Sequence, residues 1–71
     1  MEFNYSRLSG RIVEKYGTHT AFAKARGYTK QTFSLKMNNK VRFTSDDIVK
    51  AVDLLDILPE EIGVYFFTFK V

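Results

Sequence analysis

Hydrophobic side chains recur with helical spacing along most of the chain. Leu8, Ile12 and Tyr16 follow one another at intervals of four residues, close to one helical turn, so they lie on one face of a helix. Gly17 follows directly and is a common end for a helix. The pattern predicts a first helix that begins near residue 4 or 6 and packs this face against a core.

The same spacing predicts two helices in the C-terminal part of the chain. Thr44 is followed three residues later by Asp47, an arrangement that resembles a capping box. The apolar residues that then run down one side are Ile48, Val52 and Leu55. Pro59 suits the first turn of a further helix, because its missing N–H would have no partner there. This last helix closes the core with Ile62, Tyr65 and Phe66.

Residues 18–39 predict two short helices joined by a tight turn. Thr18 can accept a hydrogen bond from the free N–H groups of the first turn, and Thr29 can do the same for the second helix. Between them, Gly27 can adopt a positive φ at low cost, which a tight connection needs. The expected arrangement is helix, short turn, helix.

The second of these helices, residues 30–38, presents a polar outer face. Phe33 and Met37 stand one turn apart and face the core. The residues left outside are Lys30, Gln31, Ser34 and Leu35. Gln can pair with adenine, Lys can reach guanine acceptors, and a small or apolar side chain can touch a thymine methyl. The face therefore suits base reading in DNA, although an ordinary helix pair with an exposed polar side has the same periodicity.

Charge is unevenly distributed along the sequence. Residues 1–43 contain nine basic and two acidic side chains, a net charge of +7, whereas residues 44–71 carry two basic and six acidic ones, a net charge of −4. A basic half that contains the candidate reading helix, with an acidic half behind it, is typical of a polyanion binder with one working face. The charge pattern therefore favours nucleic acid as the partner.

Size and composition argue against an enzyme. Seventy-one residues make one small domain with little room for a pocket, and there is no cysteine and a single histidine, so zinc sites and disulfides are not expected. Asp46, Asp47, Glu60 and Glu61 fall in the first turns of predicted helices, where carboxylates complement the helix dipole rather than form an acid–base pair. No signal peptide or membrane span is evident. We expect a cytoplasmic protein that uses no cofactor or metal.

The stretch AFAKARGYTKQTFSLKMNNK resembles the helix-turn-helix of the Cro and lambda-repressor type regulators, particularly the short single-domain members of phages and prophages. The resemblance covers residues 5 to about 66. It implies an all-α, compact five-helix, lambda-repressor-like fold, with a helix-turn-helix DNA-binding domain over residues 1–66 and its motif at 18–39. Beyond the resemblance, residues 67–71 are expected to form a short C-terminal tail that is apolar and extended.

The resemblance also assigns contacts to DNA. It implies that base edges are read by Lys30, Gln31, Ser34 and Leu35. The residues expected at phosphates are His19, Lys24, Thr29, Thr32, Asn38, Asn39 and Lys40. His19 stands where many relatives have Gln, so affinity for DNA is expected to improve mildly towards acidic pH. Asn39 replaces the usual Gly and tolerates the left-handed conformation needed at that helix end.

The C-terminal tail exposes more apolar surface than a free tail should. If extended from residue 65, it places Tyr65, Phe67, Phe69 and Val71 on one side. The aromatic residues either fold back and complete a small core, or they form a subunit contact. In the second case a homodimer would present two reading helices about 34 Å apart to an inverted-repeat operator.

Three functions fit these patterns. The preferred hypothesis is a Cro-like transcriptional repressor that lodges residues 30–38 in the major groove of a double-stranded operator and excludes polymerase. The alternative is an antirepressor or modulator that binds another phage repressor protein, with the apolar tail and the acidic half as its interface. A third is a nonspecific nucleic-acid or RNA binder, which would not distinguish an operator from a random duplex.

Overall fold

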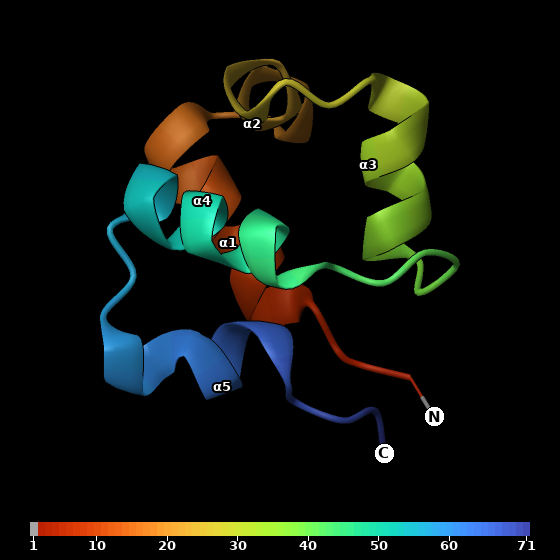
Figure 1. Cartoon of the computed structure of the whole chain (residues 1–71), viewed down its shortest axis with the longest axis vertical. Helices are drawn as coiled ribbons and strands as arrows, with labels where there is room; N and C mark the ends of the chain where they lie inside the picture. The colour runs from red at the N-terminus through yellow and green to blue at the C-terminus, as the bar shows by residue number, and fades with distance from the viewer. Residues whose placement is uncertain (1) are drawn as a thin grey trace.

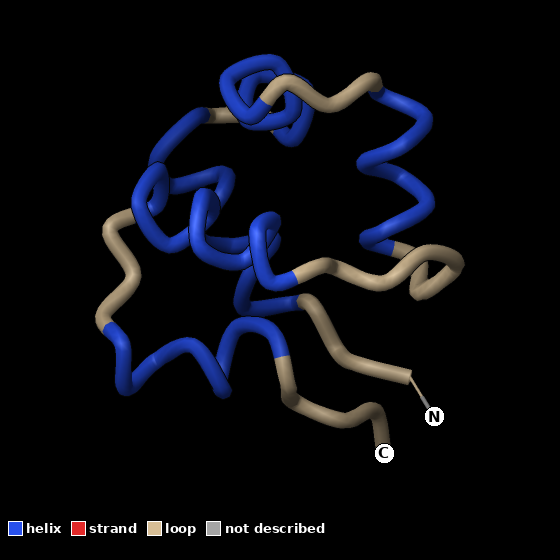
Figure 2. Tube along the Cα trace, viewed as in Figure 1, coloured by secondary structure: helices blue, strands red, loops and turns tan. Residues whose placement is uncertain are grey.

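Every predicted helix is present in the computed structural model, which describes residues 2–71 (Figure 1). The helices are α1 (Ser6–Tyr16), α2 (His19–Arg26), α3 (Lys30–Met37), α4 (Ser45–Leu55) and α5 (Ile62–Phe66), with a short 3-10 helix, η1 (Pro59–Glu61), leading into α5. Figure 2 shows that helices and short loops account for the described residues, without a drawn strand. The prediction of an all-α, five-helix fold is confirmed.

The helix boundaries follow from the capping residues. Thr18 and Thr29 each accept a hydrogen bond from the backbone N–H three residues later, at 3.0 and 3.1 Å. Gly27 ends α2 with φ +89°, the left-handed conformation that costs glycine little. Thr44 and Asp47 form a reciprocal capping box at the start of α4. All four signals were readable in the sequence.

The core lies where α1, α2, α4 and α5 meet. α1 contacts each of the other three helices, and α2 also contacts α3, which lies at the margin of the molecule (Figure 1). The largest fully buried side chains are Leu8, Ile12, Phe22, Leu55 and Phe66. Phe33 of α3 joins this core, its ring centroid 5.6 Å from that of Phe22. The apolar faces predicted for the helices are the faces that the structure buries.

A buried ion cluster ties α2, α3 and α4 together. The Asp47 carboxylate accepts hydrogen bonds from Arg26 Nη2 at 2.9 Å, Lys36 Nζ at 2.8 Å, the Tyr28 hydroxyl at 2.6 Å and the Thr44 N–H at 2.8 Å. Lys36 is only 7% exposed and Asp47 5%. The sequence pattern predicted Asp47 as a cap and helix-dipole residue, but it did not reveal the two cations that meet it.

This cluster keeps Asp47 ionised. Burial alone would raise the pKa of the Asp47 carboxyl, but the hydrogen bonds from Lys36, Thr44 and Tyr28 outweigh burial and hold that pKa well below its usual range. Burial and the hydrogen bond to Asp47 together raise the pKa of the Tyr28 hydroxyl. A charged carboxylate between two buried cations is therefore the stable state at neutral pH.

The two ends of the chain lie side by side (Figure 1). Phe3 and Phe69 form an isolated antiparallel bridge, flanked by hydrogen bonds from the Asn4 N–H to the Thr68 carbonyl at 2.6 Å and from the Lys70 N–H to the Glu2 carbonyl at 3.0 Å. The alternation predicted for an extended tail from Tyr65 is wrong at its start, because α5 remains helical through Phe66. The tail is extended only after α5, where it pairs with the N-terminal segment.

Candidate protein-interaction surface

The outer face of α3 is open, as the sequence predicted. Lys30, Gln31, Ser34 and Leu35 are all exposed, and none of them is covered by another part of the described chain. The helix turns Phe33 and Lys36 inward instead. This geometry is compatible with base reading, but exposure of a polar helix face does not by itself establish a nucleic-acid partner.

Several residues predicted to contact phosphate bond within the protein. The Thr29 hydroxyl caps α3 and donates to the Thr32 hydroxyl at 2.9 Å. The Asn38 amide donates to the backbone carbonyl one turn earlier in α3, at 2.8 Å. Lys24 and Lys40 are exposed and have no ion pair among residues 2–71. Only some of the residues predicted to contact phosphate are thus without a hydrogen bond or ion pair among the described residues.

His19 packs between α1 and α3. Its Nε2 lies 2.7 Å from the hydroxyl oxygen of Ser9, and its ring stands edge-on to Phe33 with centroids 5.8 Å apart. The ring nitrogen that was expected to hold a phosphate is therefore hydrogen-bonded to a serine. The DNA contacts assigned to this and the other residues stay a prediction.

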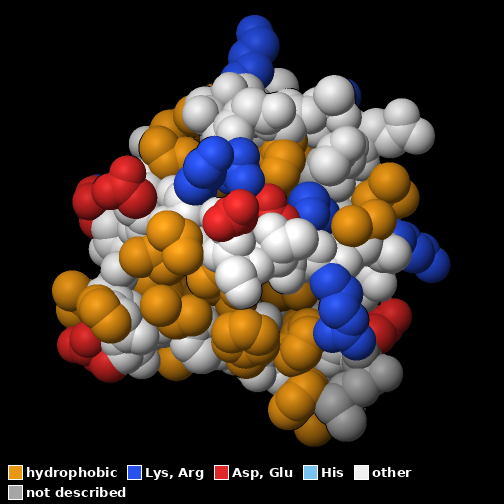
Figure 3. Space-filling view, viewed as in Figure 1, with side chains coloured by type: hydrophobic (Ala, Val, Ile, Leu, Met, Phe, Trp, Pro, Cys, Tyr) orange, Lys and Arg blue, Asp and Glu red, His pale blue; other side chains and the backbone are white. Residues whose placement is uncertain are grey.

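Part of the positive charge of the basic half is neutralised within the protein. Among the nine cations of this half, four are held in intramolecular ion pairs: Arg11 with Glu14, Lys15 with Asp56, and both Arg26 and Lys36 with Asp47. On the face drawn in Figure 3, Lys and Arg side chains are separated by apolar and acidic ones. The net charge of residues 1–43 thus overstates the positive surface available to DNA.

A surface of aromatic side chains forms where the chain ends meet; we call Phe3, Phe67 and Phe69 the terminal aromatic surface. The Phe3 ring stacks on Phe69 with centroids 5.2 Å apart and meets Phe67 edge-on at 5.8 Å. Phe67 and Phe69 remain 50% and 55% exposed. Phe66, in contrast, is 2% exposed and belongs to the core. The last residue of α5 therefore completes the core, whereas the tail after it presents two rings to solvent.

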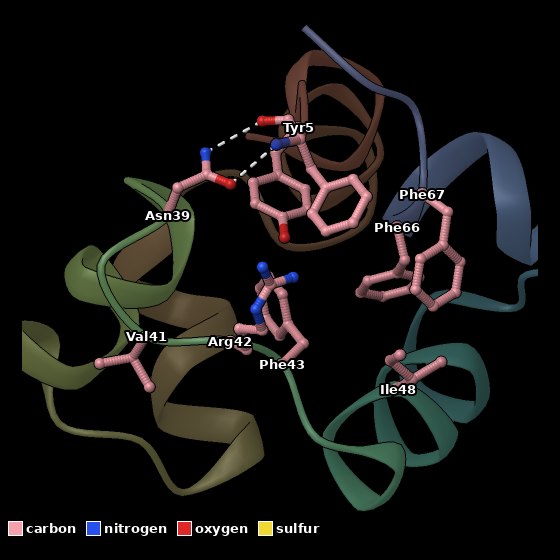
Figure 4. A pocket seen from close by; sticks show the side chains of 9 residues that line it. Tyr5, Asn39, Val41, Arg42, Phe43, Ile48, Phe66 and Phe67 are labelled. Carbon is pink, nitrogen blue, oxygen red and sulfur yellow. Dashed lines mark hydrogen bonds between the residues drawn. The ribbon is translucent and has the colours of Figure 1, made fainter. Parts of the chain in front are cut away.

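A hollow of about 150 Å³ opens beside this surface (Figure 4). It lies between the N-terminal segment, the loop after α3, the start of α4 and the end of α5. The side chains that line it are Phe3, Tyr5, Asn39, Val41, Arg42, Phe43, Ile48, Phe66 and Phe67. Two other grooves on the described chain lie between α2 and α4 and beside α3.

Asn39 fixes the N-terminal segment to this surface. Its amide donates to the Phe3 carbonyl at 3.0 Å, and its side-chain oxygen accepts from the Phe3 N–H at 2.8 Å (Figure 4). Its φ of 62° confirms the left-handed conformation predicted for this position. The Asn39 side chain was predicted to approach a phosphate. It pairs instead with the backbone N–H and carbonyl of Phe3, as a neighbouring strand would, and holds Phe3 against the tail.

Replacing Asn39 with Gly should loosen the terminal aromatic surface without straining the loop. Gly accepts the same positive φ but removes both hydrogen bonds, each worth about 0.5–1.5 kcal/mol. We expect the Phe3 amide to exchange with solvent about tenfold faster or more, as measured by hydrogen exchange. Asn39→Asp, which keeps the acceptor and loses the donor, should lie between Gly and the unchanged protein. Equal exchange rates in all three would show that Asn39 does not hold this segment.

Membrane-spanning helices and clusters of metal ligands are both missing from residues 2–71. Among residues 2–71, no helix has both the length and the apolar character needed to cross a bilayer. No group of three or more His, Cys, Asp or Glu side chains could hold a metal ion in the same part of the chain.

Comparison with known proteins places the chain among phage regulators. The sequence model of a family described as "Protein of unknown function (DUF739)" matches residues 1–69. A search of curated proteins finds no match. Among solved structures, the chain is similar to the solution structure of the modulator of repression (MOR) of the temperate bacteriophage TP901-1 from Lactococcus lactis. The identity is 48% and the TM-score 0.85, covering 100% of this chain and 96% of that chain.

These comparisons contradict the preferred functional hypothesis. A Cro-like repressor that occupies an operator directly is wrong for this chain, because the similar protein is a modulator of repression and the matching family is not a Cro or lambda-repressor family. Neither comparison supports operator DNA or a homodimer as the partner. The relationship to phage regulators is confirmed at this coarser level, and the alternative hypothesis fits the comparisons better.

Proposed function

Because the chain belongs to the DUF739 family and is 48% identical to a phage modulator of repression, we propose that it modulates repression by binding a repressor protein. In this role the chain covers part of the repressor and changes its action without itself occupying an operator. The predicted setting is the cytoplasm of the host, where a repressor and its operator meet.

The observation that carries this proposal is the terminal aromatic surface. Residues that dominate protein interfaces are often aromatic side chains near a pocket, surrounded by contacts that exclude water. Phe67 and Phe69 are half exposed, although exposed aromatic rings cost a free protein solubility. They lie next to a hollow lined by aromatic and aliphatic side chains together with Asn39 and Arg42. A partner that covers them would bury both rings and fill the hollow at the same time.

The available area is sufficient for a specific complex. Burying the exposed halves of two phenylalanine rings removes roughly 200 Å² of apolar surface, or about 5 kcal/mol before the costs of association. A typical stable interface covers about 800 Å² on each partner. The described chain exposes 4760 Å², so such an interface would take roughly one sixth of its surface. The aromatic rings would be the centre of the contact, and neighbouring side chains its rim.

A mobility-shift experiment separates binding of a repressor from binding of DNA. The purified chain is incubated with an operator fragment, with the repressor encoded beside its own gene, and with both. We expect no specific shift with the chain alone, and an altered repressor shift when the chain is added. A specific shift by the chain alone, with the repressor shift unaffected, would overturn the proposal.

A further inference from the structure

Two side chains that line the hollow, Tyr5 and Arg42, carry hydrogen-bond donors without an acceptor among the described residues. The Tyr5 side chain is 9% exposed, yet its hydroxyl makes no hydrogen bond within residues 2–71. Arg42 has no ion pair within the same residues. The Arg42 guanidinium lies over the Phe3 ring, 5.7 Å from its centroid, and Arg42 and Tyr5 line the same hollow (Figure 4). Both donors are therefore free to bind an acceptor that a partner brings to the hollow.

The electrostatics of the hollow favour an anion. Burial raises the pKa of the Tyr5 hydroxyl, and the positive charge of Arg42 partly opposes that rise. The Arg42 guanidinium is therefore close enough to the hydroxyl to influence its charge. Arg42 forms no ion pair with a described carboxylate, and Glu2 and Asp47 are paired elsewhere, with Lys70 at 3.3 Å and with Arg26 and Lys36. A positive charge and a free O–H therefore face the same opening.

The whole hollow has about the volume of one side chain. Its volume of about 150 Å³ is of the size of an engineered apolar cavity that binds benzene. Phe43, Ile48, Phe66 and Phe67 supply the apolar walls. A side chain of leucine or phenylalanine would fill this space, whereas a sugar–phosphate backbone offers no group to occupy it.

We propose that the hollow receives an apolar side chain of the repressor that stands next to a carboxylate, and that the carboxylate accepts hydrogen bonds from Tyr5 and Arg42. This inference rests on the proposed function, because it takes a repressor protein as the occupant. It adds the chemistry that the partner must present: a leucine- or phenylalanine-like residue beside Asp or Glu. The carboxylate would satisfy both unpartnered donors, and the apolar side chain would displace water from the hollow.

Conservative substitutions test the two donors separately. Tyr5→Phe removes only the hydroxyl, and Arg42→Gln removes the charge of an exposed side chain. Binding of the neighbouring repressor is measured by calorimetry, with the full chain in each case. We expect Tyr5→Phe to weaken binding about fivefold, Arg42→Gln about tenfold and Arg42→Lys less than Arg42→Gln, since hydrogen bonds to charged groups contribute more than neutral ones. The double variant should lose less than the product of the two, because both donors share one acceptor.

Lys40→Gln is the matched control. Lys40 is an exposed cation on the same loop and does not line the hollow, so its loss should change affinity by less than twofold. The midpoint temperature of thermal unfolding of Tyr5→Phe should be unchanged or slightly raised, so a loss of binding would not be due to a loss of folding. If the unchanged chain binds the repressor and the Tyr5 and Arg42 variants bind equally well, this inference is overturned while the proposed function stands. Failure of the unchanged chain to bind the repressor would overturn the proposed function itself. Binding to a DNA duplex that depends on Arg42 would show instead that Arg42 contacts phosphate, which would overturn the inference about the hollow.

Discussion

Asp47→Ala is expected to lower the free energy of unfolding by about 3–5 kcal/mol, the largest loss from any single substitution outside the apolar core. The change leaves the Arg26 and Lys36 side chains buried without their counter-ion, and such unpaired charges are costly. It also removes the capping box of α4. Because a domain of this size has only about 5 kcal/mol or little more to lose, the variant should be largely unfolded at 37 °C. Urea unfolding followed by circular dichroism measures the effect.

Asp46→Ala provides the control for this prediction. Asp46 is the neighbouring carboxylate in the same helical turn, but it is exposed and forms no ion pair among the described residues. Its replacement should cost about 0.5 kcal/mol, the effect of one charge near a helix N-terminus. Similar losses for the two variants would show that the buried cluster does not hold α2, α3 and α4 together.

The same cluster predicts loss of stability in acid. The pKa of the Asp47 carboxyl in the folded protein lies well below its value of about 3.9 in the unfolded chain, so the folded state binds fewer protons. Its contribution is therefore fully present above about pH 4 to 5 and is lost as the pH falls further. The urea midpoint of the unchanged protein should drop steeply below pH 4.

Removing the two exposed rings of the tail should abolish most of the affinity for a repressor. Truncating an aromatic residue at the centre of an interface often costs 2 kcal/mol or more, which is about 30-fold in Kd. We therefore expect Phe67→Ala and Phe69→Ala each to weaken binding at least 30-fold in calorimetry. Both rings are half exposed, so the helical circular dichroism spectrum should be retained.

Val49→Ala is the matched control for these variants. Val49 is 66% exposed on α4 and lines neither the hollow nor the terminal aromatic surface. Its loss should leave repressor binding within about twofold of the unchanged protein. Equal effects of Val49→Ala and Phe69→Ala on repressor binding would show that the terminal aromatic surface is not the binding site.

The fold could be predicted from the sequence because its signals are local. Thr18, Gly27, Thr29 and the pair Thr44 and Asp47 act on residues within one helical turn, and all of them act as predicted. The apolar faces are equally local, since they depend on spacings of three and four residues. Local rules of this kind determine where helices begin, end and pack.

The interaction surface could not be predicted because it joins distant segments. The hollow combines residues from the N-terminal segment, the loop after α3, α4 and α5. The hydrogen bonds between Asn39 and Phe3 likewise join residues that are 36 positions apart. The sequence indicated an apolar tail, and a protein interface was one of the roles predicted for it. It did not show that Tyr5 and Arg42 would line the same hollow. Lys36 was missed for the same reason, because its buried partner lies on another helix.

The error about function has a different physical origin. An exposed polar α3 beside a basic half-sequence is expected of a DNA reader, and the structure does expose Gln31 and Ser34. However, four of the nine cations are neutralised within the protein, which a count of charges along the sequence cannot register. An exposed polar helix beside a basic half-sequence therefore does not by itself assign DNA binding.

Titration calorimetry of the purified chain into the repressor encoded beside its gene, without DNA, tests the central claim most directly. A saturable complex of defined stoichiometry, lost in the Phe67→Ala and Phe69→Ala double variant, is the predicted result. Absence of any heat of binding at micromolar concentrations, with both proteins folded, would contradict the claim that this chain acts by binding a repressor.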